Sequence, residues 1–433
     1  MPSGPPSVKN PLLTEPAAGN GLLDRRIFLK DGLILLGASS LAAVSLTPAR
    51  ADESPDIPPW MQSPGSPFSG YGAPSQYESH VVRARIRSKP GTTGSGASNT
   101  PLEALDGMIT PNGLHYERHH SGVPDIDPNK HRLLIHGLVK RPLIFTVEAL
   151  LRYPMVSRIH FLECSGNSLG MYRPSPPAMT CGELHGMVSC SEWTGVSLRL
   201  LLDEAGVDPQ AQWLLAEGSD SAAMSRSVPM AKAMDDAFLA LYQNGERLRP
   251  ENGYPVRLFL PGFEGNMNVK WLRRLKATPT PTMTKDETSR YTDLQANGKS
   301  LMFTYPMEVK SVITQPSPSM TMRGPGLYEV SGIAWSGNGA IKQVEVSADG
   351  GQTWAAAALS APVLPRALTR FRIPWKWNGG PAVLKSRATD DTGAIQPTRD
   401  ALVGAHGANA IFHYNAIQAW QVATNGEVKN VYA

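Results

Sequence analysis

The pattern of hydrophobic and polar positions differs between two long stretches of the chain, and this difference predicts two domains. Between residues 111 and 305, short apolar runs at 131–137 and 255–260 predict strands. In the same stretch, residues 198–205 carry leucines at helical spacing and precede Gly206, which predicts a short helix that ends at the glycine. We therefore expect a mixed α/β domain over 111–305.

From residue 306 the pattern changes to an alternation of apolar and polar positions. It is clearest over 328–335, 341–347 and 369–375, and turn residues separate these runs. Residues 349–351 (DGG) form a hairpin turn of the kind that needs positive φ. Short strands at this spacing predict an immunoglobulin-like β-sandwich over 306–420, so the expected fold class is α+β.

The N-terminal 51 residues have the pattern of a twin-arginine signal peptide. Arg25 and Arg26 precede the uncharged stretch 32–46, and residues 49–51 (ARA) match an Ala-x-Ala cleavage site. The apolar stretch is shorter than the ~20 residues that a membrane-spanning helix needs. We therefore expect that residues 1–51 are removed and that the protein is exported to the periplasm.

Two further segments lack the periodicity of either domain. Residues 52–110 are rich in Pro and Gly and have few periodic apolar positions, which predicts an extended N-terminal arm. Residues 421–433 follow the last strand pattern and are expected to form a C-terminal tail.

Composition excludes two classes of protein. With 41 Lys and Arg against 37 Asp and Glu, the net charge of +4 is small and no basic run occurs, so nucleic acid is not an expected partner. Three cysteines in 433 residues exclude a disulfide scaffold. The spacing leaves open a bridge between Cys181 and Cys190, which would leave Cys164 free or ligated.

Cys164 is the first candidate for chemistry. It follows an apolar strand pattern and precedes a Ser-Gly-Asn turn, where a thiolate is suited to be a nucleophile or a soft metal ligand. A nucleophile would need a histidine base, for which His160, His119 and His120 are candidates. A separate zinc or iron site at His115, His119 and His120 is a further alternative, although nearby Pro and Gly disfavour a helix there.

Four separated motifs resemble those of the sulfite oxidase family of molybdenum enzymes, in the same order and spacing. They are residues 162–167 (LECSGN), 192–198 (EWTGVSL), 252–257 (NGYPVR) and 269–272 (VKWL). The resemblance covers about 112–420 and implies a molybdopterin-binding domain followed by a dimerisation domain. Residues 185–193 (HGMVSCSEW) make the chain most similar to the branch of the family that contains sulfane dehydrogenases.

The resemblance also implies the roles of individual residues. Cys164 would be the thiolate ligand of molybdenum, and Arg118 and Tyr291 would face the substrate. Basic residues suit a cofactor that carries a phosphate, because guanidinium and ammonium groups neutralise it. The implied contacts to the molybdopterin are Tyr116, Arg118, His119, His120, Asp220, Asn252, Arg257, Asn268, Val269 and Lys270.

The chain departs from the family pattern at two positions. Leu169 stands five residues after the cysteine, where relatives that oxidise sulfite usually carry an arginine. Asn252 stands where many relatives have a histidine. The loss of a cation weakens the expected electrostatic capture of sulfite and favours a sulfane substrate on a carrier protein. A sulfite dehydrogenase remains the alternative.

The electrons from such an oxidation must leave the chain. The sequence has no Cys-x-x-Cys-His motif for a c-type haem, so no haem is expected here. The resemblance implies a c-type dihaem cytochrome subunit as acceptor, a sulfur-carrier protein as substrate, and a homodimer of this chain within an α₂β₂ complex. A non-catalytic exported binding protein is the alternative from another class, with residues 347–354 as an Asp-box hairpin.

Overall fold

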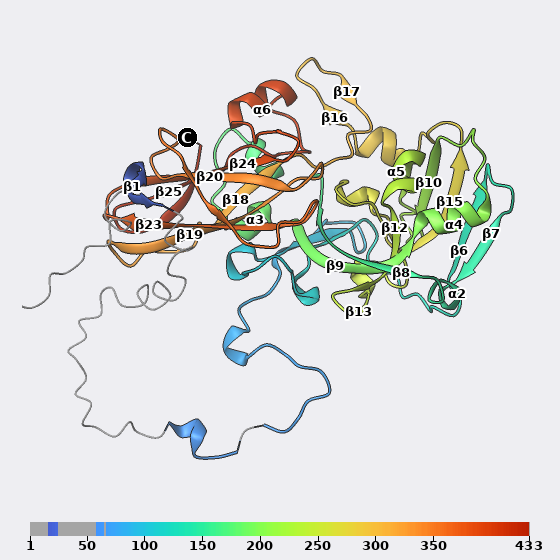
Figure 1. The fold of residues 1–433 in the computed structure, drawn as a ribbon, viewed down its shortest axis with the longest axis horizontal. Coiled ribbons are helices and arrows are strands. Elements are labelled where there is room, and N and C mark those ends of the chain that lie inside the picture. The colour runs from blue at the N-terminus through green and yellow to red at the C-terminus, as the bar shows by residue number, and fades with distance from the viewer. Residues whose placement is uncertain (1–15, 25–57, 65, 433) are drawn as a thin grey trace, which may run out of the picture.

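The computed structural model describes residues 16–24, 58–64 and 66–432, which form two lobes joined along one side (Figure 1). The twin arginines and the apolar stretch 32–46 of the predicted signal peptide lie outside the described residues. None of the helices in the described part of the chain has the length and apolar character needed to cross a membrane.

The first lobe is built on two five-stranded sheets with short helices around them. One sheet has the order β11-β10-β15-β6-β7, and only its β15–β6 pair is parallel. Its strands are β6 (Arg132–Gly137), β7 (Leu143–Thr146), β10 (Trp213–Gly218), β11 (Ser225–Pro229) and β15 (Leu272–Thr278). The other sheet contains β8 (Met155–Glu163), β9 (Val188–Ser197), β12 (Phe238–Gln243), β13 (Glu246–Arg247) and β14 (Arg257–Phe259). The helices are α2 (Val147–Leu150), α3 (Cys181–His185), α4 (Leu198–Ala205) and α5 (Met230–Asp235).

Helix α4 forms where the leucine spacing predicts it. Leu198, Leu201 and Leu202 are fully buried, as expected for apolar residues at i, i+3 and i+4. The helix ends at Gly206, which adopts φ 68° and accommodates the left-handed conformation without a Cβ penalty. The predicted helix is therefore confirmed at both ends.

The second lobe is a sandwich of two antiparallel sheets. One has the order β1-β2-β23-β19-β18, with β22 also on β23, and the other has the order β21-β20-β24-β25-β26. The main strands of the first are β18 (Lys310–Gln315), β19 (Gly326–Trp335), β22 (Ala358–Leu359) and β23 (Thr369–Trp377). Those of the second are β20 (Ile341–Ser347), β21 (Ala355–Ala356), β24 (Ala382–Asp390), β25 (Ala419–Val422) and β26 (Val428–Val431), and helix α6 is Arg399–His406. The α+β class and the predicted sandwich are confirmed.

Two predicted boundaries are wrong. The segment 421–433 is not a tail, because β25 extends to Val422 and β26 pairs with it. The arm predicted over 52–110 ends earlier, because β3 (Ala84–Ser88) and β4 (Gly96–Asn99) form a three-stranded sheet with β5 (Glu117–His119). Strand β4 consists of small residues and shows no alternation, whereas β3 does alternate apolar residues with arginine but is only five residues long.

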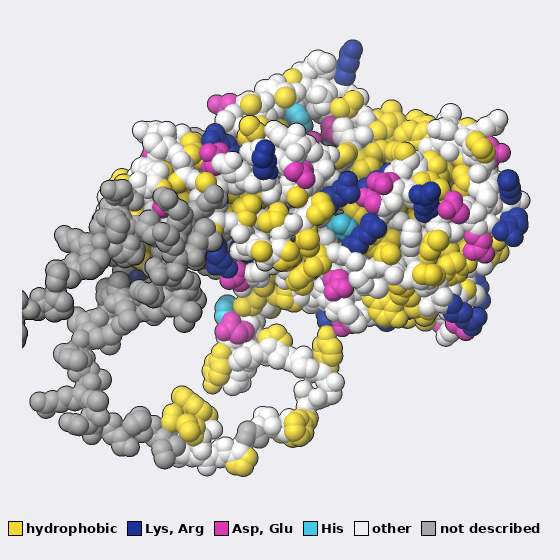
Figure 2. Space-filling model, viewed as in Figure 1, with side chains coloured by type: hydrophobic (Ala, Val, Ile, Leu, Met, Phe, Trp, Pro, Cys, Tyr) yellow, Lys and Arg dark blue, Asp and Glu magenta, His cyan; other side chains and the backbone are white. Residues whose placement is uncertain are grey.

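The part of the arm over residues 58–64 and 66–80 stands away from both lobes (Figures 1 and 2). It carries large apolar side chains that are mostly exposed, among them Trp60, Phe68 and Tyr77. Tyr71 tethers it to the first lobe by donating a hydrogen bond to Glu246 Oε2 over 3.0 Å.

One hydrophobic core crosses the boundary between the lobes. Phe161 and Cys190 of the first lobe belong to the same buried cluster as Trp335 and Trp420 of the sandwich. Cys181 is also buried in this cluster, and all three cysteines are free thiols. The bridge between Cys181 and Cys190 that the spacing left open is therefore not formed. Both act as core residues.

Candidate active site

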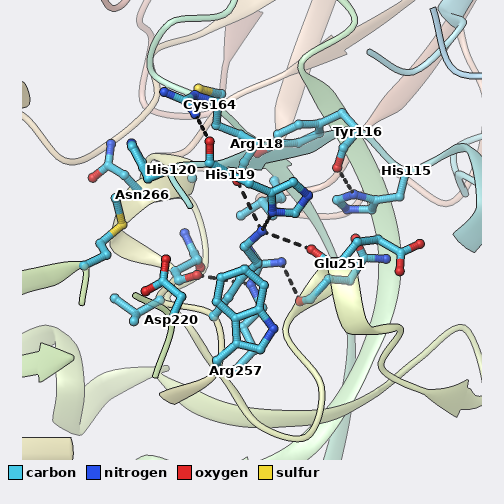
Figure 3. Close-up of a pocket in the computed structure, with 18 of the residues that line it drawn as sticks. His115, Tyr116, Arg118, His119, His120, Cys164, Asp220, Glu251, Arg257 and Asn266 are labelled. Atoms are coloured by element: carbon cyan, nitrogen blue, oxygen red, sulfur yellow. Dashed lines mark hydrogen bonds between the residues drawn. The ribbon is translucent and has the colours of Figure 1, made fainter. Parts of the chain in front are cut away.

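All the site residues predicted from the sequence converge on one cavity in the first lobe (Figure 3). About 60 Å³ of this inner cavity admits the centre of a water-sized sphere. The roles of the individual residues stay predictions, but the structure does bring these residues together around one cavity. They are Tyr116, Arg118, His119, His120, Cys164, Asp220, Asn252, Arg257, Asn268, Val269, Lys270 and Tyr291.

Cys164 follows the last residue of β8, and a tight loop turns its side chain toward the cavity. Its backbone N–H donates to Met187 O over 3.0 Å, and its carbonyl accepts from Asn167 N over 2.8 Å. Burial raises the pKa of the Cys164 thiol, and the positive charge of Arg118 opposes that shift. A cation or metal at this position therefore favours the thiolate.

A buried ion pair from both lobes supports the cysteine loop. Glu163 and Lys310 are each 1% exposed, and Lys310 Nζ lies 3.3 Å from Glu163 Oε1. Asn167 Nδ2 donates to the same Glu163 oxygen over 2.9 Å, and Trp335 Nε1 donates to Glu163 Oε2 over 2.6 Å. The residue before Cys164 is thus fixed by two side chains of the sandwich, Lys310 and Trp335.

Buried cations gather on the inner wall. Lys270 Nζ donates to Arg118 O over 3.1 Å and to His119 Nδ1 over 2.7 Å. Burial, with Arg257 second, lowers the pKa of Lys270, and burial lowers the pKa of Arg257 to about 10. Burial and the charge of Lys270 lower the pKa of His119 to about 3, so this histidine is neutral and accepts from the lysine. Lys270 and Arg257 place two buried cations on this wall, and such a pair suits a phosphate.

Polar atoms without partners also point to a bound molecule. Asp220 Oδ1, Asn266 Oδ1 and His115 Nε2 are buried, and none has a hydrogen-bond partner among the described residues. Buried polar atoms are nearly always paired, so these three fit a ligand that carries both donors and acceptors. Figure 3 shows Cys164 at one end of the cavity and Asp220 and Arg257 at the other. The residues present therefore fit a pterin with a phosphate group and a metal near the cysteine.

Tyr291 is held between a histidine and an arginine. Its hydroxyl lies 3.0 Å from His120 Nε2, and the Arg226 guanidinium carbon lies 4.9 Å from its ring centroid. Arg226 is fixed in turn by Glu287 at 3.0 Å and Glu264 at 3.2 Å, all three buried. Burial raises the pKa of Tyr291, so its hydroxyl keeps its proton at neutral pH.

The cavity continues into a second space, here called the outer opening. The two share Arg118, His120, Cys164 and Tyr291, and about 720 Å³ of the outer opening admits the centre of a water-sized sphere. Among the residues that line only the outer opening, the sequence singled out Leu169 and gave no sign of the other charged and large apolar residues, which come from distant segments. They are basic residues Arg87, Lys89 and Arg290, and apolar residues Met187, Ile411 and Phe412.

Two of the alternatives left open by the sequence are not supported: a separate zinc or iron site, and His160 as a base for Cys164. His119 lies in strand β5, and no group of three or more His, Cys, Asp or Glu side chains within the described ranges is arranged to hold a metal ion. The zinc or iron site proposed at His115, His119 and His120 is therefore wrong. His160 Nδ1 lies 3.3 Å from Arg366 O in the sandwich, so that nitrogen is occupied away from Cys164.

Comparison with known proteins identifies the class to which this fold and site belong. Residues 120–285 match the model of the oxidoreductase molybdopterin binding domain, and residues 302–419 match the Mo-co oxidoreductase dimerisation domain. Sulfite oxidase of Gallus gallus is 29% identical over 370 residues, which cover 79% of this chain and 78% of that protein. The chain belongs to the sulfite oxidase family of molybdopterin oxidoreductases. A non-catalytic binding protein, the alternative from another class, is therefore wrong.

Among solved structures, the chain resembles the sulfane dehydrogenase SoxCD from Paracoccus pantotrophus. The TM-score is 0.85 at 45% sequence identity, and the match covers 87% of this chain and 98% of that chain. The NADH nitrate reductase of Solanum lycopersicum is 32% identical over 318 residues, which are 65% of this chain and 34% of that enzyme. The chain thus spans about a third of that reductase. The predicted family and its sulfane dehydrogenase branch are confirmed.

Proposed function

We propose that this chain is the molybdenum subunit, of the SoxC type, of an exported sulfane dehydrogenase. It would oxidise carrier-bound sulfane sulfur during thiosulfate oxidation. The observation that carries the proposal is the likeness to a sulfane dehydrogenase chain at 45% identity over 98% of its length. The apolar side of the outer opening supports it, because Leu169, Ile411 and Phe412 suit a sulfur group that arrives on a larger molecule.

In this proposal the residues of the inner cavity bind and orient the cofactor. Bound molybdenum-molybdopterin would supply oxygen-atom transfer to sulfur and take up two electrons. Cys164 would hold the metal as a thiolate, while Arg257 and Lys270 would neutralise the phosphate. Tyr291 would hold a proton at its hydroxyl beside neutral His120, within reach of a substrate oxygen.

The partners and the location belong to the same proposal. A twin-arginine motif at Arg25 and Arg26 supports export of the folded chain to the periplasm. A c-type dihaem cytochrome of the SoxD type would accept the electrons, and a sulfur-carrier protein would bring the substrate. The match of residues 302–419 to a dimerisation domain supports a homodimer within an α₂β₂ complex.

A sulfite dehydrogenase is the second candidate, and one observation favours it. Arg87 and Arg290 lie in the wall of the outer opening beside Arg118, so the fold supplies cations that Leu169 does not. Burial, followed by the charge of Arg118, lowers the pKa of Arg87, in keeping with the position of both side chains in the wall of the outer opening. Grouped guanidinium groups suit a small dianion such as sulfite.

Steady-state kinetics of the purified holoenzyme, assayed with its cytochrome, decide between the two. We expect kcat/KM to be at least ~100-fold higher for the sulfane-loaded carrier than for free sulfite, a difference of about 2.7 kcal/mol. Metal analysis of the same sample should give about one molybdenum per chain. Efficient turnover of sulfite with no turnover of the loaded carrier would exclude the sulfane dehydrogenase.

A further inference from the structure

The segment that precedes the twin arginines is an added strand of the C-terminal sandwich. Strands β1 (Pro16–Ala18) and β2 (Leu22–Leu23) pair with each other, and Leu22 pairs with Trp375 of β23 in antiparallel register. In Figure 1, β1 lies against the sandwich, far along the chain from its neighbours. Leu22 is 0% exposed and Leu23 is 3% exposed. A segment with such burial is packed into the domain.

Hydrogen bonds from two consecutive residues fix this segment to both sheets. Trp375 Nε1 donates to Asn20 O over 2.8 Å, which ties the segment to β23. Asn20 Nδ2 donates to Ala348 O over 2.8 Å, and Gly19 N donates to Thr353 Oγ1 over 2.6 Å, both in the hairpin after β20. The contacts are sequence-specific, because they use the Asn20 side chain and two side chains of the sandwich.

The two glycines of the segment fit where no larger residue would. Gly21 has φ +88°, and a Cβ there would collide with the Lys376 carbonyl oxygen. A Cβ on Gly19 would collide with the Asp349 carboxylate. The run Gly-Asn-Gly-Leu-Leu is therefore complementary in shape to the surface that it covers.

The segment covers an edge that the sandwich otherwise leaves open. Strand β22 pairs with β23 only at Phe371 and Arg372, and β2 occupies the same edge further along, at Trp375. An uncovered edge strand offers free backbone groups to other chains, so proteins usually cover such edges. The covering strand here comes from a segment that lies within the predicted signal peptide.

We propose that residues 16–23 are a detachable edge strand that holds the leader on the folded sandwich, so that export must compete with docking. Arg25 and Arg26 lie outside the described residues, but Arg25 is only two positions after Leu23 in the sequence. A docked strand would therefore end next to the export motif. The role in export rests on the export stated under the proposed function, whereas the docking does not. A docked leader delays departure and leaves time for cofactor insertion.

Hydrogen exchange of the full-length chain, purified with its leader, tests the docking. Gly21→Val should abolish protection of the amides in residues 16–23, because both the positive φ and the collision oppose valine. Ala17→Val is the matched control, since Ala17 lies in β1 with its side chain exposed. We expect protection of roughly tenfold or more in the wild type and the control. Unprotected amides in the wild type, or equal protection in Gly21→Val, would refute the docked strand.

Pulse–chase export of the same chains tests the consequence. We expect Gly21→Val to leave the cytoplasm several-fold faster than wild type and Ala17→Val, with less molybdenum per exported chain. Thr353→Val removes the acceptor for Gly19 N from the sandwich side and leaves the leader sequence intact, so it should shift the rate in the same direction. Equal rates for all four chains would refute the competition. If none is exported, the proposed export fails, while the exchange data still decide the docking.

Discussion

The inner cavity and the outer opening meet at Cys164 but are built in opposite ways. The inner wall is buried and comes mainly from the first lobe, where Lys270 and Arg257 bond to backbone carbonyls of the same domain. The outer wall is more exposed and combines the N-terminal segment at Arg87, the cysteine loop at Leu169, and the sandwich at Phe412. A buried inner wall suits a resident cofactor, whereas an outer wall assembled from three separate segments suits a substrate that comes and goes.

The largest effect is expected where the two spaces meet. Cys164→Ser replaces a soft thiolate by a hydroxyl, which is a poor ligand for this metal. We expect turnover to fall well beyond the roughly 10- to 100-fold that loss of an outer partner of a metal site costs. Steady-state kinetics at equal molybdenum content measure this. Retention of most activity would show that Cys164 is not the metal ligand.

A loss confined to the inner cavity should follow from Lys270→Met. Removal of one buried partner of a charge pair costs about 2–5 kcal/mol in binding, so we expect the cofactor to dissociate far more readily. The measurement is molybdopterin and phosphate per chain after gel filtration. Unchanged cofactor content would contradict the assignment of Lys270 to the phosphate.

The same deletion of a cation in the outer opening should have a different outcome. Arg87→Met is expected to leave the molybdenum content unchanged and to raise KM for an anionic substrate. A hydrogen bond to a charged group contributes about 1.5–3 kcal/mol of binding free energy, and we expect a loss near the lower value because Arg87 is half-buried. Kinetics and metal analysis of one preparation separate the two effects. Loss of cofactor in this variant would break the distinction between the two spaces.

The smallest effect concerns the loop that carries Phe412. Burial opposes the charging of His413, but contacts to Glu264 and Glu308 outweigh it and raise the pKa of His413 well above its usual value. Asp293 also faces it, at 3.8 Å. Because the pKa of His413 is higher in the folded than in the unfolded protein, its charged form stabilises the fold. This stabilisation is fully present below the unfolded-state pKa near 6.5 and is lost as the pH rises through the folded-state pKa.

The free energy of unfolding should therefore fall above pH ~6.5, by at most about 1.4 kcal/mol per pH unit from this group. Urea denaturation between pH 6 and pH 9 measures the slope. His413→Gln cannot titrate, so it should be less stable than wild type at pH 6 and should show a shallower decline. Parallel slopes for the two proteins would remove His413 from this role.

How far the sequence predicts the molecule depends on how local each feature is. Gly206 ends its helix through its own backbone, and residues 162–167 form a compact motif, so both are predictable. Strand β4 is recognisable only from its partners, because Gly96–Asn99 has no alternating pattern. Arg87 and Phe412 lie more than 300 positions apart and meet only in the folded chain, so no motif identifies the outer opening.

The contact between Glu163 and Lys310 also bears on how the chain is divided into modules. The two matched family domains meet between residues 285 and 302, which suggests a natural point at which to separate the two halves of the chain. A first lobe cut there would keep Glu163 without its counter-ion, at a cost of about 3–5 kcal/mol. Because this ion pair and the shared hydrophobic core both cross the boundary, the two halves should unfold together, and a graft should move them together.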